Sequence, residues 1–221
     1  GAPLSQVKDD KELVPLSDII RKLHKETRIR GKEVAIALPE SLVFTRTIKF
    51  PSLTDQEVAS AIKWEAEQYI PIPISEAIIE HQIIERSQGG ASSGVTVLLV
   101  ASPRALVEKY IKLIQGAGLT TVGVETEVLA LTRSLAPETG TVLLLDFGAV
   151  STEAAIVKDG MVRFSRSIPT AGEAFTRALS QNLGIEYQQA EAYKKTYGLS
   201  RDLEGKIKAS LAPVFNFVAE E

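Results

Sequence analysis

The sequence predicts an α/β protein in two parts. Short runs of β-branched and apolar residues alternate with segments of helical periodicity along the chain. The 221 residues are 44% hydrophobic, which is enough for a sizeable core in one large or two smaller domains. A turn-forming segment, Pro137-Glu138-Thr139-Gly140, divides the chain. We therefore expect a first part over 1–137 and a second part over 138–221.

Composition excludes several classes of function. The 25 basic and 28 acidic residues are mixed along the chain and give a formal charge of -3, so no basic surface for nucleic acid is expected. The absence of cysteine excludes disulfides and thiolate metal sites, and only two histidines argue against a zinc site. No apolar run approaches the roughly 20 residues that span a bilayer, so we expect no direct membrane insertion. A reducing cytoplasm fits this composition.

The first part begins with a predicted helix over 17–27, where Ser17 stands at the N-cap position. Two β-branched segments follow, over 33–39 and 42–50. Because the turn-forming residues 39–41 separate them, we expect these two strands to form a hairpin.

The strongest helix signal in the chain starts at Thr54. Glu57 follows three residues later, which is the spacing of a capping box, and Pro71 ends the helix because proline has no amide donor. Two further apolar segments, 77–86 and 95–102, are joined by a Gly- and Ser-rich loop and predict a second hairpin.

The remaining elements alternate between the two types until the last helices. The apolar strand at 141–148 is expected to be buried on both faces, and the hairpin that follows turns at Asp159-Gly160. The other predicted elements are helices at 103–116, 126–136, 171–184, 186–198 and 204–221 and a strand at 119–125.

The segment "LLLDFGAVST" carries the clearest chemistry in the sequence. A strand ends in Asp146, Gly148 lets the backbone approach an anion, and the hydroxyls of Ser151 and Thr152 can donate to phosphate oxygens. A carboxylate can hold Mg²⁺ through water, which this interpretation requires because the acid alone would repel phosphate. The alternative is a plain hairpin in which Asp146 caps the turn.

Three further segments are compatible with a nucleotide site. Glu125 ends a strand just before a helix, Gly172-Glu173 starts a helix, and Glu191 and Lys194 share a helical face. Each also has a structural explanation. Glu125 can be an acid that favours the helix N-terminus, and Glu191 with Lys194 can be a solvated surface pair.

The order of these segments resembles the second half of the actin and heat-shock-chaperone ATPase fold. Within that superfamily the chain is similar to the PilM family of type IV pilus assembly. The similarity covers about three-quarters of the chain, and it rests on "VAIALPESLVFTRTIKFP", "EAEQYIPIP", "VLLVASPRALVEKYIKLIQGAGL" and "LLLDFGAVSTEAAIVKDGMVRFSRSIPTAGEAFTRAL". The resemblance implies an actin-like, ribonuclease H-like ATPase fold. It also implies that 33–118 is a small inserted α+β subdomain of the first lobe, as in the related cell-division protein FtsA.

The same resemblance implies ATP and Mg²⁺ as cofactors. Glu125 would lie near the metal or the attacking water, and Asp146 would hold Mg²⁺ through water. The residues that would contact the nucleotide are Asp146, Phe147, Gly148, Ala149, Ser151, Thr152, Gly172, Glu173, Glu191 and Lys194.

The resemblance also implies a protein partner. Family members bind the cytoplasmic N-terminal tail of the membrane protein PilN on the first lobe, which places them at the cytoplasmic face of the inner membrane together with other platform proteins. Trp64 and Tyr69 are candidates for that contact, although aromatic residues at helical spacing more often belong to a core. Homo-oligomer formation stays open at this point.

Two features of the family pattern are missing from the chain. Nothing before Val34 resembles the first phosphate motif, and no glycine-rich adenine segment follows the last helix. We therefore expect a fragment that binds ATP weakly or not at all and is at most a weak ATPase. An FtsA-like division scaffold and an actin-fold small-molecule kinase are the alternatives.

Overall fold

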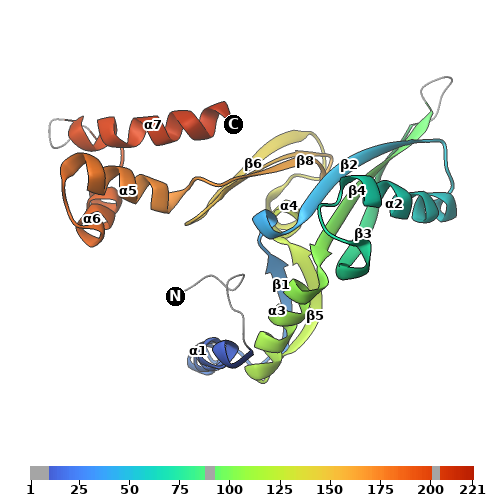
Figure 1. Cartoon of the computed structure of the whole chain (residues 1–221), viewed down its shortest axis with the longest axis horizontal. Coiled ribbons are helices and arrows are strands. Elements are labelled where there is room, and N and C mark those ends of the chain that lie inside the picture. The colour runs from blue at the N-terminus through green and yellow to red at the C-terminus, as the bar shows by residue number, and fades with distance from the viewer. Residues whose placement is uncertain (1–9, 88–92, 201–204) are drawn as a thin grey trace. The chain divides into compact units, whose positions relative to one another are not determined.

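The structure is a computed structural model that describes residues 10–87, 93–200 and 205–221 (Figure 1). The loop predicted between the strands of the second hairpin falls largely outside these residues. The first nine elements are α1 Leu13–Glu26, β1 Glu33–Leu38, β2 Phe44–Pro51, α2 Asp55–Tyr69, β3 Ala77–Ser87, β4 Gly94–Pro103, α3 Arg104–Gly116, β5 Thr120–Thr126 and α4 Glu127–Leu135. The others are β6 Thr141–Phe147, β7 Thr152–Lys158, β8 Met161–Ile168, α5 Gly172–Leu183, α6 Tyr187–Tyr197 and α7 Lys206–Glu220. Short 3₁₀ helices occupy Asp10–Glu12, Glu40–Leu42 and Ile74–Glu76.

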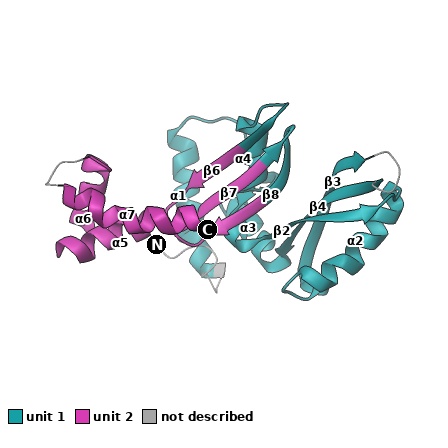
Figure 2. Ribbon diagram, turned by 90° about the horizontal axis from the view of Figure 1, so that it is seen from above, with its two compact units in different colours: residues 1–142, 157–164 teal, residues 143–156, 165–221 magenta. Residues whose placement is uncertain are grey.

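Contacts divide the chain into two compact units (Figure 2). Unit 1 comprises residues 1–142 and 157–164, and unit 2 comprises 143–156 and 165–221. The β strands of the described residues form three sheets, with the orders β1-β5, β2-β4-β3 and β6-β7-β8.

The predicted hairpin between the first two strands is wrong. β1 pairs with β5 in parallel, whereas β2 pairs with β4 in antiparallel fashion, so the two strands belong to different sheets. The residues between them form the 3₁₀ helix Glu40–Leu42, in which the Leu42 amide donates to the Pro39 carbonyl. The partner of β1 lies more than 80 residues further along the chain, and local turn signals carry no information about such a pairing.

The first helix begins earlier than predicted, and Ser17 is not its cap. α1 starts at Leu13 after the 3₁₀ turn, which leaves Ser17 buried within the helix. The Ser17 hydroxyl donates to the Leu113 carbonyl of α3 at 2.9 Å. A Cβ at Gly116 would come within 2.5 Å of the Ser17 Oγ, so the glycine allows α1 and α3 to approach closely. Ser17 therefore stabilises helix packing rather than a helix end.

The sheet β2-β4-β3 carries a hydrophobic core of unit 1. β4 is its central strand and is antiparallel to both neighbours, which confirms the predicted hairpin of β3 and β4. One face of the sheet packs against α2. The core residues on that side are Ile48, Phe50, Val58, Ile62, Ala66, Ile70, Val95, Val97, Leu99 and Ala101.

The second part matches its predicted turn but not its predicted burial. Asp159 and Gly160 both have positive φ, at 52° and 72°, as a tight turn between β7 and β8 requires. Along β6, however, alternate side chains are exposed: Leu143 is 61% and Leu145 52% accessible. The continuous apolar run therefore does not correspond to a strand covered on both faces in this chain.

The helices of unit 2 form a separate small core. Phe175 and Leu179 of α5 pack against Ala190 of α6 and against Ile207 and Leu211 of α7. This arrangement holds α5 and α6 side by side, so that Lys194 of α6 can reach Gly172 and Thr176 of α5.

The capping box on α2 is present as predicted. The Thr54 hydroxyl accepts from the Glu57 amide, and the Thr54 amide donates to the Glu57 carboxylate at 2.8 Å. Replacing Thr54 with alanine should lower the free energy of unfolding by about 1 kcal/mol, because an amide of the first turn loses its acceptor. Urea denaturation of Thr54→Ala measures this. The matched control is Ser52→Ala, at an exposed position just before the helix, which should change stability far less. Equal losses in both variants would contradict the assignment.

Candidate functional site

The loop after β6 is tightly folded in unit 2. The Gly148 amide donates to the Ser151 carbonyl at 3.1 Å. A Cβ added to Gly148 would lie 2.9 Å from the same Ser151 oxygen, which is closer than carbon and oxygen can approach. Glycine at this position is therefore a steric requirement of the loop, as expected where a backbone is shaped to approach a ligand.

The start of α5 holds this loop in place. The Gly172 amide donates to the Gly148 carbonyl at 3.1 Å, and the Glu173 amide donates to the Ala149 carbonyl at 2.8 Å. Thr152 is fully buried, and its hydroxyl donates to the Thr170 carbonyl at 2.7 Å. In this structure the first amides of α5 and the Thr152 hydroxyl thus serve the shape of the loop. Their assignment as nucleotide contacts stays a prediction.

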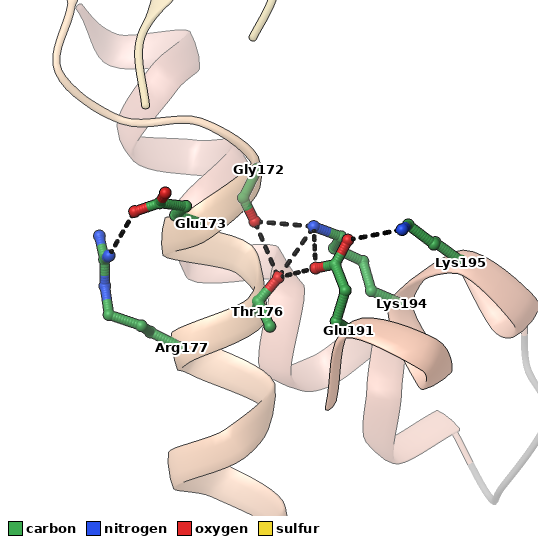
Figure 3. A network of polar contacts seen from close by, with 7 residues as sticks. All are labelled: Gly172, Glu173, Thr176, Arg177, Glu191, Lys194 and Lys195. Atoms are coloured by element: carbon green, nitrogen blue, oxygen red, sulfur yellow. Dashed lines mark hydrogen bonds and ion pairs between the residues drawn. The ribbon is translucent and has the colours of Figure 1, made fainter. Parts of the chain in front are cut away.

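Glu191 and Lys194 are not a simple solvated pair. Figure 3 shows Lys194 pointing from α6 toward the start of α5, where its Nζ lies 2.9 Å from the Gly172 carbonyl and 2.8 Å from the Thr176 hydroxyl. The same ammonium lies 2.7 Å from the Glu191 carboxylate, and the Thr176 hydroxyl donates to that carboxylate. Lys195 adds a third contact to Glu191, at 3.3 Å. The network ties α6 to the first turn of α5, whose amides hold the loop in place.

The environment of Glu191 favours its ionised form. Hydrogen bonds from Lys194, then from Thr176, lower the pKa of its carboxyl to about 2, against an ordinary value of 4.5. Glu191 therefore stays charged over the whole physiological range and keeps the Lys194 ammonium in position.

A cavity of about 310 Å³ opens beside the loop in unit 2. Its lining is largely apolar and includes the rings of Phe175 and Phe215, whose centroids are 4.4 Å apart. The cavity is lined by Phe147, Gly148, Gly172, Phe175, Lys194, Gly198, Leu199, Leu211 and Phe215. The structure thus brings together four of the predicted residues: Phe147, Gly148, Gly172 and Lys194. Phe175 and Phe215 escaped prediction because aromatic residues at helical spacing look like ordinary core.

No cluster that could bind a metal appears in the described parts of the chain, taken as three or more acidic or histidine side chains. Asp146 is the one acid of the loop and is half-buried. Glu125 lies in unit 1, where its carboxylate pairs with Arg133 of α4. The roles predicted for Asp146 and Glu125 at a magnesium ion remain predictions.

A second cavity, of about 340 Å³, lies within unit 1. Its walls come from the β1-β5 sheet, the β2-β4-β3 sheet and the helices α3 and α4, and they are mostly apolar. The lining residues are Leu38, Val43, Ile78, Glu80, His81, Gln82, Leu98, Val100, Ser102, Val107, Val124, Glu125, Thr126 and Leu129. Apart from Glu125, none of these residues is predicted from the sequence, because they lie on elements that are distant along the chain.

The register of β3 and β4 explains how this cavity forms. Side chains two residues apart share one face of a strand, so every second residue of β4 faces the cavity. The cross-strand pairs on that face are Gln82 with Leu98, Glu80 with Val100, and Ile78 with Ser102. The opposite face of the sheet packs on α2. Alternate side chains of β4 therefore belong to the core on one face and to the cavity wall on the other.

Trp64 and Tyr69 do not line this cavity. Trp64 is 74% exposed on α2, and the ring of Tyr69 carries the Arg46 guanidinium at 3.8 Å from its centroid. Their assignment to a partner contact stays a prediction.

Comparison with known proteins now decides the family. A family model described as type IV pilus assembly protein PilM matches residues 5–221. The chain belongs to the PilM family. A solved structure titled "PilM-PilN type IV pilus biogenesis complex" matches 99% of the chain with a TM-score of 0.80 and 28% identity, and the match covers 65% of that protein.

More distant relatives agree with this PilM assignment. The cell division protein FtsA of Neisseria meningitidis serogroup B is 26% identical over 218 residues, and that of Enterococcus hirae is 23% identical over 211. The chain spans about half the length of these curated relatives, 51% and 48%. MreB 5 of Spiroplasma citri bound to AMPPNP matches 94% of the chain and 56% of its own length, with a TM-score of 0.52 and 17% identity, which shows the fold alone. The predicted fold class, an actin-like α/β fold, is confirmed.

The Glu191 network makes the stability of this PilM chain depend on pH. Because its pKa is lowered on folding, the stabilisation is fully present above about pH 4.5 and is lost as the pH falls toward 2. Glu191→Gln should therefore be less stable than the wild type at pH 7, and the difference should shrink as the pH approaches 2. Urea denaturation from pH 7 to pH 2.5 measures this. Glu173→Gln, which loses only an exposed pair with Arg177, is the control. A difference that persists unchanged at pH 2.5 would refute the role of the carboxylate.

Proposed function

We propose that this chain is part of a nucleotide-binding scaffold of type IV pilus assembly, which holds the cytoplasmic tail of PilN in the cavity of unit 1. One observation carries the proposal: the match of 99% of the chain, with a TM-score of 0.80, to a solved PilM–PilN complex. Through PilN the scaffold is held at the cytoplasmic face of the inner membrane. Contacts with further platform proteins belong to the same proposal.

The cavity of unit 1 has the properties of a peptide site. Its volume, about 340 Å³, lies in the range of small ligand pockets and accommodates one or two large apolar side chains. Leu98 and Val107 on its walls are already buried, so an apolar side chain that enters meets a preformed apolar surface. Burial of such a side chain contributes about 1.5–3 kcal/mol. The acids Glu80 and Glu125 lie at the same cavity and favour a peptide without a negative charge.

The loop of unit 2 supports the nucleotide part of the proposal. Among the described residues, the amides of Ala149, Val150 and Ser151 donate to no protein acceptor. Successive free amides in a tight loop form a concave site for an anion such as a phosphate. The α5 bonds to Gly148 and Ala149 fix this shape before any ligand binds. Asp146, which precedes the loop, would hold Mg²⁺ through water, and the magnesium would supply the charge that neutralises phosphate oxygens.

The family match and the PilM–PilN structure favour this function over a cell-division scaffold, the role suggested by the FtsA relatives. Binding of the PilN tail distinguishes the two. The role proposed here is that of a scaffold whose partner contacts respond to the nucleotide, rather than that of a metabolic enzyme.

Filling the unit 1 cavity should weaken peptide binding. Val124 lines the cavity from β5 and is partly exposed, so Val124→Trp should occupy part of the space without disturbing the core. We expect at least a tenfold loss of affinity for a synthetic PilN tail peptide, measured by titration calorimetry. Val122→Trp, on the same strand but away from the cavity, should bind like the wild type. Equal affinity of all three proteins would place the peptide elsewhere.

Trp64 provides an independent check in the wild-type chain, since it is the single tryptophan. If the peptide occupies the cavity, its addition should leave the wavelength of Trp64 emission unchanged. A shift on peptide addition would favour the contact through Trp64 and Tyr69 instead.

Nucleotide binding at the loop should be visible in amide spectra. Addition of Mg-ATP to the ¹⁵N-labelled chain should shift the signals of Ala149, Val150 and Ser151, even at millimolar affinity, because phosphate would accept from these amides. Gly148→Ala should abolish the shifts, since its Cβ collides with the Ser151 carbonyl. Gly31→Ala, where an added Cβ meets nothing within 4 Å, is the control. Unchanged loop signals at 10 mM Mg-ATP would count against the proposal.

A further inference from the structure

Ser102 is an unusual residue within the cavity of unit 1. It is only 6% exposed, and its hydroxyl has no hydrogen-bond partner among the described residues. It lies on the β4 face that forms the cavity wall, in register with Ile78 of β3. The Oγ itself is buried as the side chain lies in the structure. Rotation about the single χ1 bond turns it toward the cavity without movement of the strand.

The neighbouring part of the same sheet face has a different environment. There the Thr47 hydroxyl donates to the Arg163 carbonyl at 2.8 Å, and Gln82 lies 3.6 Å from the Met161 sulfur. Arg163 also pairs with Glu85 at 2.6 Å. The start of β8 therefore provides partners for Thr47, Gln82 and Glu85 at that end of the sheet. At the other end, around Ser102, the face borders the cavity instead.

A buried hydroxyl without a partner is costly. Removal of a hydroxyl from water without a compensating hydrogen bond costs about 1–3 kcal/mol. Alanine at the same position has no hydroxyl and would avoid this desolvation penalty. Val100, two residues away on the same face of β4, and Ile78, the cross-strand partner of Ser102, are apolar. Ser102 differs from other buried hydroxyls without a partner, such as that of Thr121, because it lines a cavity. A ligand in the cavity can therefore supply the missing partner, and the hydrogen bond then forms in a site that excludes water.

We propose that the cavity binds a largely apolar peptide segment that presents one uncharged hydrogen-bonding group to Ser102. This inference rests on the proposed function and names the chemistry by which the site selects its peptide. An apolar side chain fills the space between β4 and the helices α3 and α4. A side-chain amide or hydroxyl of the peptide next to it pairs with the serine. A negatively charged group at this position is rejected, because it would lose its hydration and lie at the same cavity as Glu80 and Glu125.

The test compares affinity with stability in Ser102→Ala. The affinity for the synthetic PilN tail peptide should fall about 3- to 10-fold, which corresponds to the loss of one neutral hydrogen bond. The stability of the free chain in urea should stay equal or rise, since the hydroxyl is unsatisfied without peptide. Thr121→Val is the matched control: it removes another unpartnered hydroxyl, on β5 and away from the cavity. Its peptide affinity should equal that of the wild type.

Alanine scanning of the peptide locates the partner group. Replacement of one polar, uncharged peptide residue should weaken binding to the wild type but not to Ser102→Ala, which is the signature of a direct contact. If the hydroxyl is instead satisfied by a trapped water, Ser102→Ala lowers the stability of the free chain and leaves the affinity unchanged, which overturns the inference. A wild-type chain that binds no peptide overturns the proposed function and this inference together. Undiminished binding by Ser102→Ala overturns this inference alone.

Discussion

The position of β4 at the centre of its sheet is the constraint on which unit 1 depends. Because β4 pairs with β2 on one side and β3 on the other, its register fixes the faces of all three strands. Residues such as Val97 and Leu99 then pack against α2, and the alternate residues, such as Val100 and Ser102, form the cavity wall. A shift by one residue would exchange the two faces, so the core that holds the sheet together also determines the chemistry of the cavity.

In unit 2 the main constraint is the fixed shape of the loop after β6. The loop closes on itself through Gly148, and α5 donates two amides to its carbonyls. Lys194 then fastens α6 to the first turn of α5, held by a carboxylate that stays ionised. The polar groups of this region thus form a support for the loop. Among the described residues, the loop amides of Ala149, Val150 and Ser151 are the ones that this support leaves without a protein acceptor.

The proposed function assigns a separate role to each of the two cavities. Actin-like proteins share a fold and differ in the chemistry of their sites, so the fold alone does not assign a role. In this chain the family match directs attention to a peptide partner and a nucleotide, and each unit contributes a cavity of suitable size. The predicted partner residues Trp64 and Tyr69 lie outside both cavities, whereas the residues that form them were mostly invisible in the sequence.

The sequence by itself determined the local features: the capping box at Thr54, the turn at Asp159-Gly160, the helices and strands, and the loop motif that indicated the family. These depend on residues within a few positions of one another, whose preferences are encoded directly. Tertiary structure alone decided that β1 pairs with β5, that Ser17 joins two helices, and that Ser102 lies at a cavity. The physical reason is that pairing and burial depend on contacts between residues far apart in the chain, which no local pattern specifies.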